Sequence, residues 1–144
     1  MTRTVSQLMG VKENSRAIFI HPDELAIDNF NLPILDIQAN LKEDFDYIHL
    51  FVKTQTKFIK NFPILKTHLK TNEMLWVSWP KGGKLGTDLN IKSVIKLGYE
   101  FGLVERTCLS INDIWSELKN TQPKKVKVYN NSYGKLNEAK TTNR

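Results

Sequence analysis

The sequence predicts an α/β fold in which a mainly parallel β-sheet is covered by helices on both faces. Three short segments are apolar at nearly every position, which is typical of strands that are buried on both sides. Roughly 25 residues separate one segment from the next, which leaves room for a helical crossover between parallel strands. The three predicted strands are Arg16–Ile20, Tyr47–Val52 and Met74–Trp79, and a shorter one is predicted at Ile34–Ile37.

Helices are predicted between these strands from the spacing of apolar side chains. The clearest is Asn90–Phe101, whose first residue suits an N-cap, with Gly102 suited to the left-handed conformation just past the end. A second apolar stripe lies within residues 55–70 but contains Pro63. Because proline has no N–H and clashes with the preceding turn, we predict two short helices there, the second beginning at Pro63. A shorter helix is predicted over residues 23–29.

The C-terminal part predicts an antiparallel hairpin followed by a tail. Residues 103–111 alternate in part between apolar and polar side chains, and Asn112 and Asp113 form a plausible turn before a strand at residues 114–119. From residue 121 the chain is polar and basic. We therefore expect one domain over residues 1–120 and a mostly disordered basic tail over residues 121–144.

Composition places the chain among ordinary globular proteins. Its 144 residues suit one domain, and 40% of them are hydrophobic and 25% charged. A single cysteine, Cys108, rules out an internal disulfide framework and fits a reducing compartment. The sequence has neither a signal-peptide pattern nor an apolar stretch long enough to cross a bilayer, so we expect a cytoplasmic protein with no membrane partner.

The formal net charge of +6 is concentrated at the C-terminal end. From residue 120 onward there are six cations against one acid, whereas residues 1–119 carry 15 cations against 14 acids. A basic tail on a nearly neutral body is more often a solubilising end than a nucleic-acid arm. Nucleic-acid binding through the tail is kept as the minority alternative, and the oligomeric state is left open.

Four motifs occur in order along the chain: Leu75-Trp-Val-Ser-Trp-Pro-Lys81, Thr87-Asp-Leu89, Gly102-Leu-Val104 and Trp115-Ser116. They resemble a family of small bacterial proteins that is classed only as a domain of unknown function, and the resemblance covers roughly residues 8–119. The order of elements is also similar to the second half of a class I methyltransferase. The resemblance implies a Rossmann-like fold and no particular activity.

The methyltransferase analogy can be tested at the turn after the first strand. Folds that bind a dinucleotide or S-adenosylmethionine need small residues there, so that the backbone can approach the cofactor. Here the turn begins His21-Pro22-Asp23 and contains no glycine. This argues against conventional cofactor binding, and we predict no cofactor.

Glycines cluster instead after the third strand, in Lys81-Gly82-Gly83-Lys84-Leu-Gly-Thr87-Asp88. Flexible glycines, two ammonium groups and the start of the following helix suit a phosphate or carboxylate. The spacing is not that of a P-loop. The alternative is a surface loop whose glycines make turns and whose lysines are solvated.

Other candidate residues give weaker signals. Trp79 lies at the carboxyl end of its strand, where open α/β sheets bind ligands, and either lines a pocket or covers the core. His49 is expected to be packed in the core, and Cys108 to be an inert buried thiol. His21 and Asp23 could bind a metal, but no third ligand is identifiable, so no metal site is predicted.

These observations favour a Rossmann-like three-layer domain that binds a small anionic ligand. The predicted contacts are Lys81, Gly82, Gly83, Lys84, Thr87, Asp88, Trp79 and His21, and no catalytic residue is assigned. The alternatives are a non-catalytic protein-interaction module and a degenerate methyltransferase-like enzyme, so whether the chain is an enzyme is left open.

Overall fold

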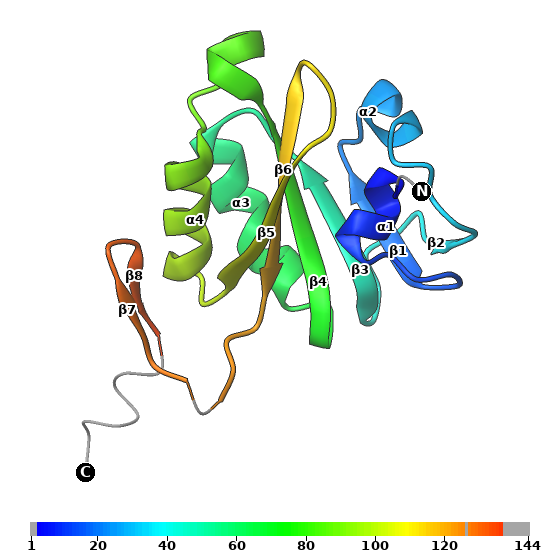
Figure 1. The fold of residues 1–144 in the computed structure, drawn as a ribbon. Helices are drawn as coiled ribbons and strands as arrows, with labels where there is room; N and C mark the ends of the chain where they lie inside the picture. Colours follow the sequence, from blue (N-terminus) through cyan, green and yellow to red (C-terminus); the bar gives the residue numbers. More distant parts are fainter. Residues whose placement is uncertain (1–2, 126, 137–144) are drawn as a thin grey trace.

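The computed structural model of the chain describes residues 3–125 and 127–136. A six-stranded sheet in the order β2-β1-β3-β4-β6-β5 forms its centre (Figure 1). The first four strands are parallel, and β6 runs antiparallel to both of its neighbours. The elements are α1 (Val5–Met9), β1 (Arg16–Ile20), α2 (Glu24–Asp28), β2 (Asp36–Ile37), β3 (Phe45–Phe51), α3 (Gln55–Lys66), β4 (Leu69–Pro80), the 3₁₀ segment η1 (Lys81–Gly86), α4 (Ile91–Glu100), β5 (Val104–Ser110), β6 (Trp115–Thr121), β7 (Tyr129–Asn131) and β8 (Gly134–Leu136).

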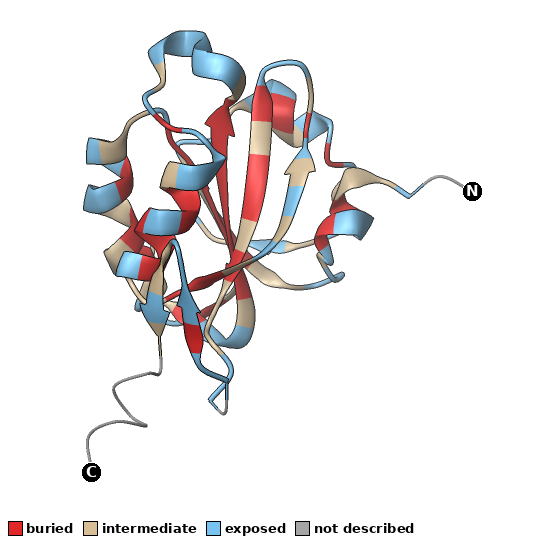
Figure 2. Cartoon of the chain, turned by 60° about the vertical axis from the view of Figure 1, so that its left-hand side comes forward, coloured by how far each residue is buried: buried red, intermediate tan, exposed pale blue. Residues whose placement is uncertain are grey.

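The predicted fold class is confirmed: the protein is a Rossmann-like three-layer α/β domain with an antiparallel end. The strands are buried on both faces, as their continuous apolarity predicts. On β3, Ile48 and Leu50 pack toward α3 and α4, whereas Tyr47 and Phe51 pack toward α1 and α2. The helices correspondingly show buried inner faces and exposed outer faces (Figure 2).

The prediction of two short helices around Pro63 is wrong, because α3 is one helix with Pro63 inside it. An internal proline loses one backbone hydrogen bond and costs roughly 3 kcal/mol. Phe58, Phe62 and Leu65 lie on both sides of the proline and are all buried. Burial of each such side chain contributes about 1.5–3 kcal/mol, so a continuous apolar face offsets the cost of the proline.

The other predicted helices and the hairpin form where the sequence places them. Asn90 caps α4 by accepting a hydrogen bond from the Ser93 N–H at 2.9 Å. Gly102 follows the helix with a φ of +85°, and Asp23 caps α2. Asn112 closes the turn between β5 and β6, since its side-chain oxygen accepts from the N–H groups of Ile114 and Trp115. No helix in the described part of the chain has the length and apolarity to cross a membrane.

The described residues after β6 include regular structure where the sequence predicts mostly disorder. β7 and β8 pair as an antiparallel hairpin beside α4. Tyr129 of β7 is buried with the main core, and Gly134 packs against the Tyr99 ring of α4. The hairpin thus docks through two aromatic contacts that a low apolar content does not reveal. The rest of the predicted tail, residues 137–144, lies outside the described residues.

A cluster of polar side chains lies inside the core between the sheet and α1. Its members are Tyr47, His49, Ser78 and Glu117, and none exposes any surface. The Tyr47 hydroxyl lies 2.7 Å from His49 Nδ1, and Ser78 Oγ lies 2.6 Å from Nε2. In either neutral tautomer, one ring nitrogen donates and the other accepts, so an uncharged ring makes both contacts.

The carboxyl group of Glu117 is the costly member of this cluster. Its Oε1 lies 3.8 Å from His49 Nε2, and neither carboxyl oxygen has a hydrogen-bond partner among the described residues. Burial raises the pKa of Glu117 to about 8 and lowers the pKa of His49 to about 3. Both groups are therefore neutral near pH 7, which avoids the cost of an uncompensated buried charge.

We predict that Gly102→Val destabilises the fold by more than about 1 kcal/mol, because a β-branched residue resists positive φ. Gly102→Asn serves as the matched control, since asparagine tolerates the left-handed region and its Cβ would meet the same neighbour, the Lys66 ammonium at 2.8 Å. Urea unfolding should show a larger loss for valine than for asparagine. Equal losses of stability in the two variants would show that the cost comes from crowding at Lys66 and not from the positive φ.

We also predict a pH-dependent stability that Glu117 controls. Its pKa is raised from 4.5 to about 8, so the folded state keeps a proton that the unfolded state releases. The free energy of unfolding should therefore fall as pH rises toward 8. His49 has the opposite effect, because its lowered pKa makes the free energy of unfolding rise with pH. That effect is confined to pH values below its ordinary pKa of 6.5.

Between pH 6.5 and 8 the wild type should lose up to about 1.4 kcal/mol per pH unit through this group. Glu117→Gln should remove that slope, as measured by urea unfolding across the range. Parallel pH profiles for the two proteins would show that Glu117 is already ionised in the folded state.

Candidate functional site

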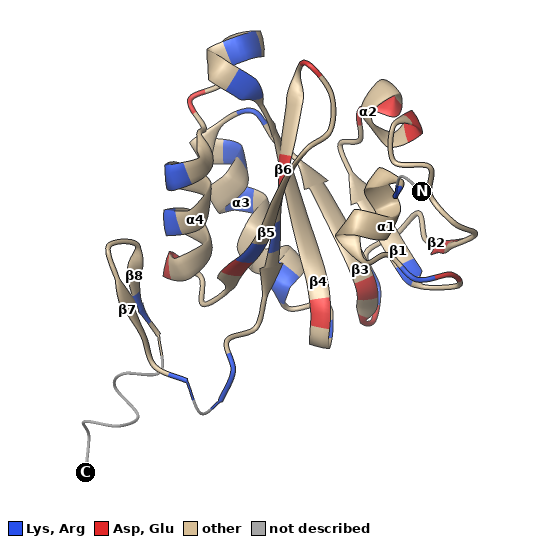
Figure 3. Cartoon of the chain, viewed as in Figure 1, with Lys and Arg blue, Asp and Glu red and all other residues tan. Residues whose placement is uncertain are grey.

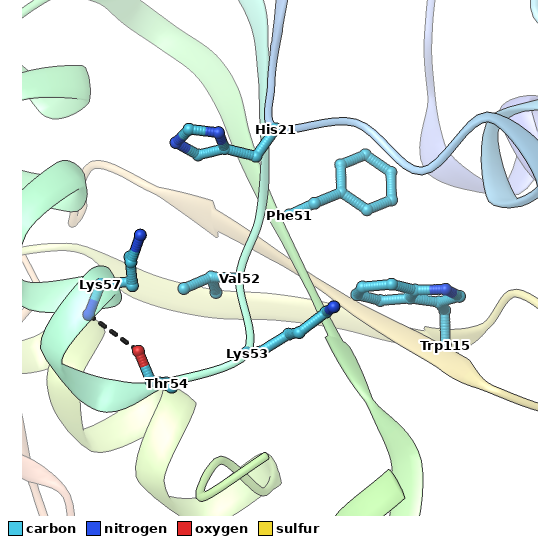
Figure 4. A pocket seen from close by; sticks show the side chains of 7 residues that line it. All are labelled: His21, Phe51, Val52, Lys53, Thr54, Lys57 and Trp115. Atoms are coloured by element: carbon cyan, nitrogen blue, oxygen red, sulfur yellow. Dashed lines mark hydrogen bonds between the residues drawn. The ribbon is translucent and has the colours of Figure 1, made fainter. Parts of the chain in front are cut away.

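A pocket of about 320 Å³ opens at the carboxyl edge of the parallel strands, where β1 and β3 end. The connection after β1 leads to α2 on one face of the sheet, and the connection after β3 leads to α3 on the other. Adjacent parallel strands whose connections leave on opposite faces define a topological switch point, the common ligand site of open α/β sheets. Its lining residues are His21, Phe51, Val52, Lys53, Thr54, Lys57 and Trp115 (Figure 4).

The pocket has an aromatic floor and a basic rim. Phe51 ends β3 and Trp115 begins β6, and their ring centroids are 5.5 Å apart in an edge-to-face arrangement. Both rings are almost fully buried. Lys53 and Lys57 are exposed, and the Lys53 side chain extends toward Trp115 (Figure 4). The described lining holds no carboxylate. This combination suits an anionic group attached to a flat apolar part.

The loop that carries Lys53 and Thr54 is fixed by hydrogen bonds from the segment before α4. Thr87 Oγ1 donates to the Lys53 carbonyl at 2.6 Å, and Asp88 Oδ1 accepts from the Gln55 N–H at 2.8 Å. Thr54 caps α3 by accepting from the Lys57 N–H. These hydrogen bonds restrain the pocket wall, which lowers the entropic cost of binding a ligand there.

The predicted residues His21, Thr87 and Asp88 come together around this pocket in different roles. His21 lines it and takes a φ of +53° directly after β1. Thr87 and Asp88 lie behind the pocket, where their side chains support the loop between β3 and α3. The prediction that they orient a ligand directly stays untested.

The glycine loop forms η1 beyond the pocket lining. Gly82 and Gly83 both take positive φ, and Lys84 is exposed. The Lys81 ammonium donates to Ser110 Oγ on β5. At the start of α4, the Ser93 N–H is already satisfied by Asn90. Lys81 and Lys84 therefore remain predicted anion contacts on a loop separate from the switch-point pocket.

Trp79 lies in the core, which was one of its two predicted positions, whereas Cys108 does not lie where the sequence predicts. Trp79 is 4% exposed and belongs to the core cluster beneath α3 and α4, which matches the core alternative rather than the pocket alternative. The prediction that Cys108 is buried is wrong: it is exposed on the edge strand β5, whose residues alternate between partly buried and exposed. Partial burial and the nearby Glu117 raise the pKa of its thiol, which disfavours the reactive thiolate.

His49 is a core residue, as predicted, although its contact with Ser78 has the spacing of a nucleophile and base. Its second nitrogen meets a tyrosine hydroxyl rather than a carboxylate. Every member of the cluster is closed to solvent, so no substrate reaches the pair in this conformation.

Sequence reasoning missed Phe51, Lys53, Lys57 and Trp115. A usable signal was present, since Lys53 and Thr54 directly follow a strand that is apolar on both faces. The carboxyl-edge rule that drew attention to Trp79 applies equally to them. Trp115 was harder to find, because only the antiparallel pairing of β6 with β4 brings its first residue to the same edge.

S-adenosylmethionine fits this pocket poorly. The turn after β1 carries His21 and Pro22 where the backbone would have to approach the cofactor, and the rim cations would repel a sulfonium. For metals, the described residues contain no group of three or more histidine, cysteine or acidic side chains arranged to hold an ion.

Comparisons with known sequences identify no relative. No protein-family model matches the chain, so the resemblance to a bacterial domain of unknown function stays a prediction. No curated protein matches it either.

Solved structures, in contrast, share the fold. The chain is similar to a precorrin-6y C5,15-methyltransferase from Geobacter metallireducens, with a TM-score of 0.56 and 7% identity over 83% of this chain and 86% of that one. It is similar to a ribosomal protein L11 methylase from Lactobacillus delbrueckii, with a TM-score of 0.54 and 11% identity over 83% and 78%. The N-methyltransferase NodS from Bradyrhizobium japonicum gives 0.53 and 13% over 83% and 91%.

At these identities the similarity concerns the fold alone. It establishes that the six-stranded sheet, with its antiparallel end, is arranged as in Rossmann-like class I methyltransferases.

Proposed function

We propose that the chain is a methyltransferase-like domain that binds a small anionic ligand with a flat apolar part in the switch-point pocket. The observation that carries the proposal is the pairing of Lys53 and Lys57 with the aromatic floor of Phe51 and Trp115 in one pocket. The ammonium groups would bind a phosphate or carboxylate, and the rings would contact the apolar part.

Position and rigidity support this proposal. The pocket occupies the edge at which doubly wound sheets bind ligands, and its loop is braced by Thr87 and Asp88. Its volume is at the lower end of the range for small-molecule sites, which suits a ligand the size of a mononucleotide or smaller.

A second candidate is methyl transfer from S-adenosylmethionine, which the fold similarity favours. The fold is its only support, since the turn after β1 and the rim charges both disfavour that cofactor. The two candidates predict opposite ligand preferences.

We predict that adenosine monophosphate raises the melting temperature more than inorganic phosphate does at matched ionic strength, because only the nucleotide has a base to contact the rings. At about 100 times the dissociation constant, binding contributes about 2.7 kcal/mol, or roughly 5–10 °C. The double variant Lys53→Ala, Lys57→Ala should lose this shift and keep its fold, since both lysines are exposed. Differential scanning fluorimetry measures each shift.

The matched control is Lys81→Ala, Lys84→Ala, which removes the same charge from η1. It should keep the nucleotide response. If only this control lost the increase in melting temperature with the nucleotide, the anion site would lie at the glycine loop. A shift with S-adenosylmethionine but none with the nucleotide would favour the methyltransferase candidate.

A further inference from the structure

Charge is divided between the two helical layers of the molecule, although the sequence total suggests a neutral body. Residues 13–46 contain eight acids and two cations, whereas residues 53–96 contain nine cations and two acids. The first segment forms α2 and the strands and loops around it, and the second includes α3, η1 and α4. Figure 3 shows the lysines of α3, η1 and α4 on one side of the molecule and the acids of α2 on the other.

Five exposed lysines form what we call the lysine face. They are Lys57 and Lys60 on α3, Lys84 on η1, and Lys92 and Lys96 on α4. Lys66 of α3 donates a hydrogen bond at 2.6 Å to the Phe101 carbonyl just after α4, so the two helices lie side by side. Their inner faces share one core cluster, which leaves the lysines on the outer side of the same layer.

Among the described residues, no lysine of this face forms an ion pair closer than 4.0 Å. Lys70 does form one, with Asp46 at 3.0 Å, but it lies outside the face. The described acids of this layer, Asp88 before α4 and Glu100 at its end, form no ion pair with these cations. Clustered unpaired cations produce a positive potential that attracts polyanions.

We propose that the lysine face binds the phosphate backbone of double-stranded nucleic acid. The cations extend over three elements, so they match a polymer of regularly spaced phosphates better than one small anion. Phe58, Phe62 and Tyr99 on α3 and α4 are buried and offer no ring for stacking. The pocket beside Lys92 and Lys96 contains one half-buried ring, that of Tyr133, whereas single strands require a series of rings for successive bases. Binding is therefore expected to depend on phosphates and to show little sequence preference.

This surface shares Lys57 with the small-molecule pocket and Lys84 with the glycine loop, and it extends beyond both. The proposed small-molecule pocket relies on Lys53 and Lys57, and the minority nucleic-acid reading of the sequence relies on the tail. Lys60, Lys92 and Lys96 belong to neither, so they can be changed while both other groups of lysines stay intact.

The test is fluorescence anisotropy of the full chain with a labelled duplex of about 20 base pairs, over a range of salt concentrations. Non-specific dissociation constants of about 10⁻⁴–10⁻⁶ M are expected at physiological salt. Lys60→Ala, Lys92→Ala, Lys96→Ala should weaken binding at least tenfold and reduce the slope of log K against log salt by nearly three, because each of the three lost phosphate contacts contributes about 0.9 to the slope through counterion release.

The matched control is Lys12→Ala, Lys42→Ala, Lys70→Ala, which removes three exposed lysines that lie outside this face. It should stay within about threefold of the wild type, since it changes the net charge equally without touching the proposed contacts. A second control, Lys124→Ala, Lys125→Ala, Lys135→Ala, examines the basic C-terminal segment. Circular dichroism confirms that each variant is folded.

Equal losses of duplex affinity in the lysine-face variant and the first control would show that binding depends on net charge alone, and would overturn the proposal. A loss only in the second control would assign binding to the C-terminal segment. Tighter binding to single strands than to duplex would contradict the argument from buried aromatics. Failure to bind any duplex, together with binding to phosphatidylserine vesicles, would identify the partner as a membrane surface.

Discussion

The parallel pairing of β3 with β1 and β4 is the constraint on which the rest of the structure depends. These strands carry apolar side chains on both faces, so each face must be covered by another layer. Because the chain leaves β1 toward one layer and β3 toward the other, the connections diverge at the shared carboxyl edge. The pocket is a geometric consequence of that divergence, and its side chains then determine what it binds.

The same division into layers separates charge as well as structure. The segment that forms the α2 layer is rich in acids, and the segment that forms α3 and α4 is rich in lysines. Since α3 begins at the pocket, its first turn contributes Lys57 both to the pocket rim and to the lysine face. The two surfaces that we propose for a small anion and for a polyanion are therefore adjacent. If both proposals hold, a long polyanion on the face and a nucleotide in the pocket would compete for this one side chain.

Much of the fold was predictable because local patterns and tertiary packing agree. β1 has the predicted bounds, and the caps at Asn90 and Gly102 are found as expected. The failures arise where distant contacts override a local rule. Pro63 is tolerated because the apolar face around it is buried, and Cys108 is exposed because β5 lies at the edge of the sheet. The site was only partly predictable for the same reason, since Trp115 reaches the pocket through the pairing of β6 and not through any local motif.

The buried cluster around His49 shows how the sheet tolerates polar residues directly beneath the pocket floor. The Phe51 ring stacks on the His49 ring, with 4.6 Å between the ring centroids. Trp115 lies two residues before Glu117 on β6. The floor rings thus separate neutral, solvent-free polar groups from the basic rim. If Glu117 were ionised, its charge would lie in a region of low dielectric constant with no hydrogen-bond partner among the described residues. A carboxyl group that stays protonated near pH 7 therefore avoids an uncompensated charge in the core beneath the proposed pocket.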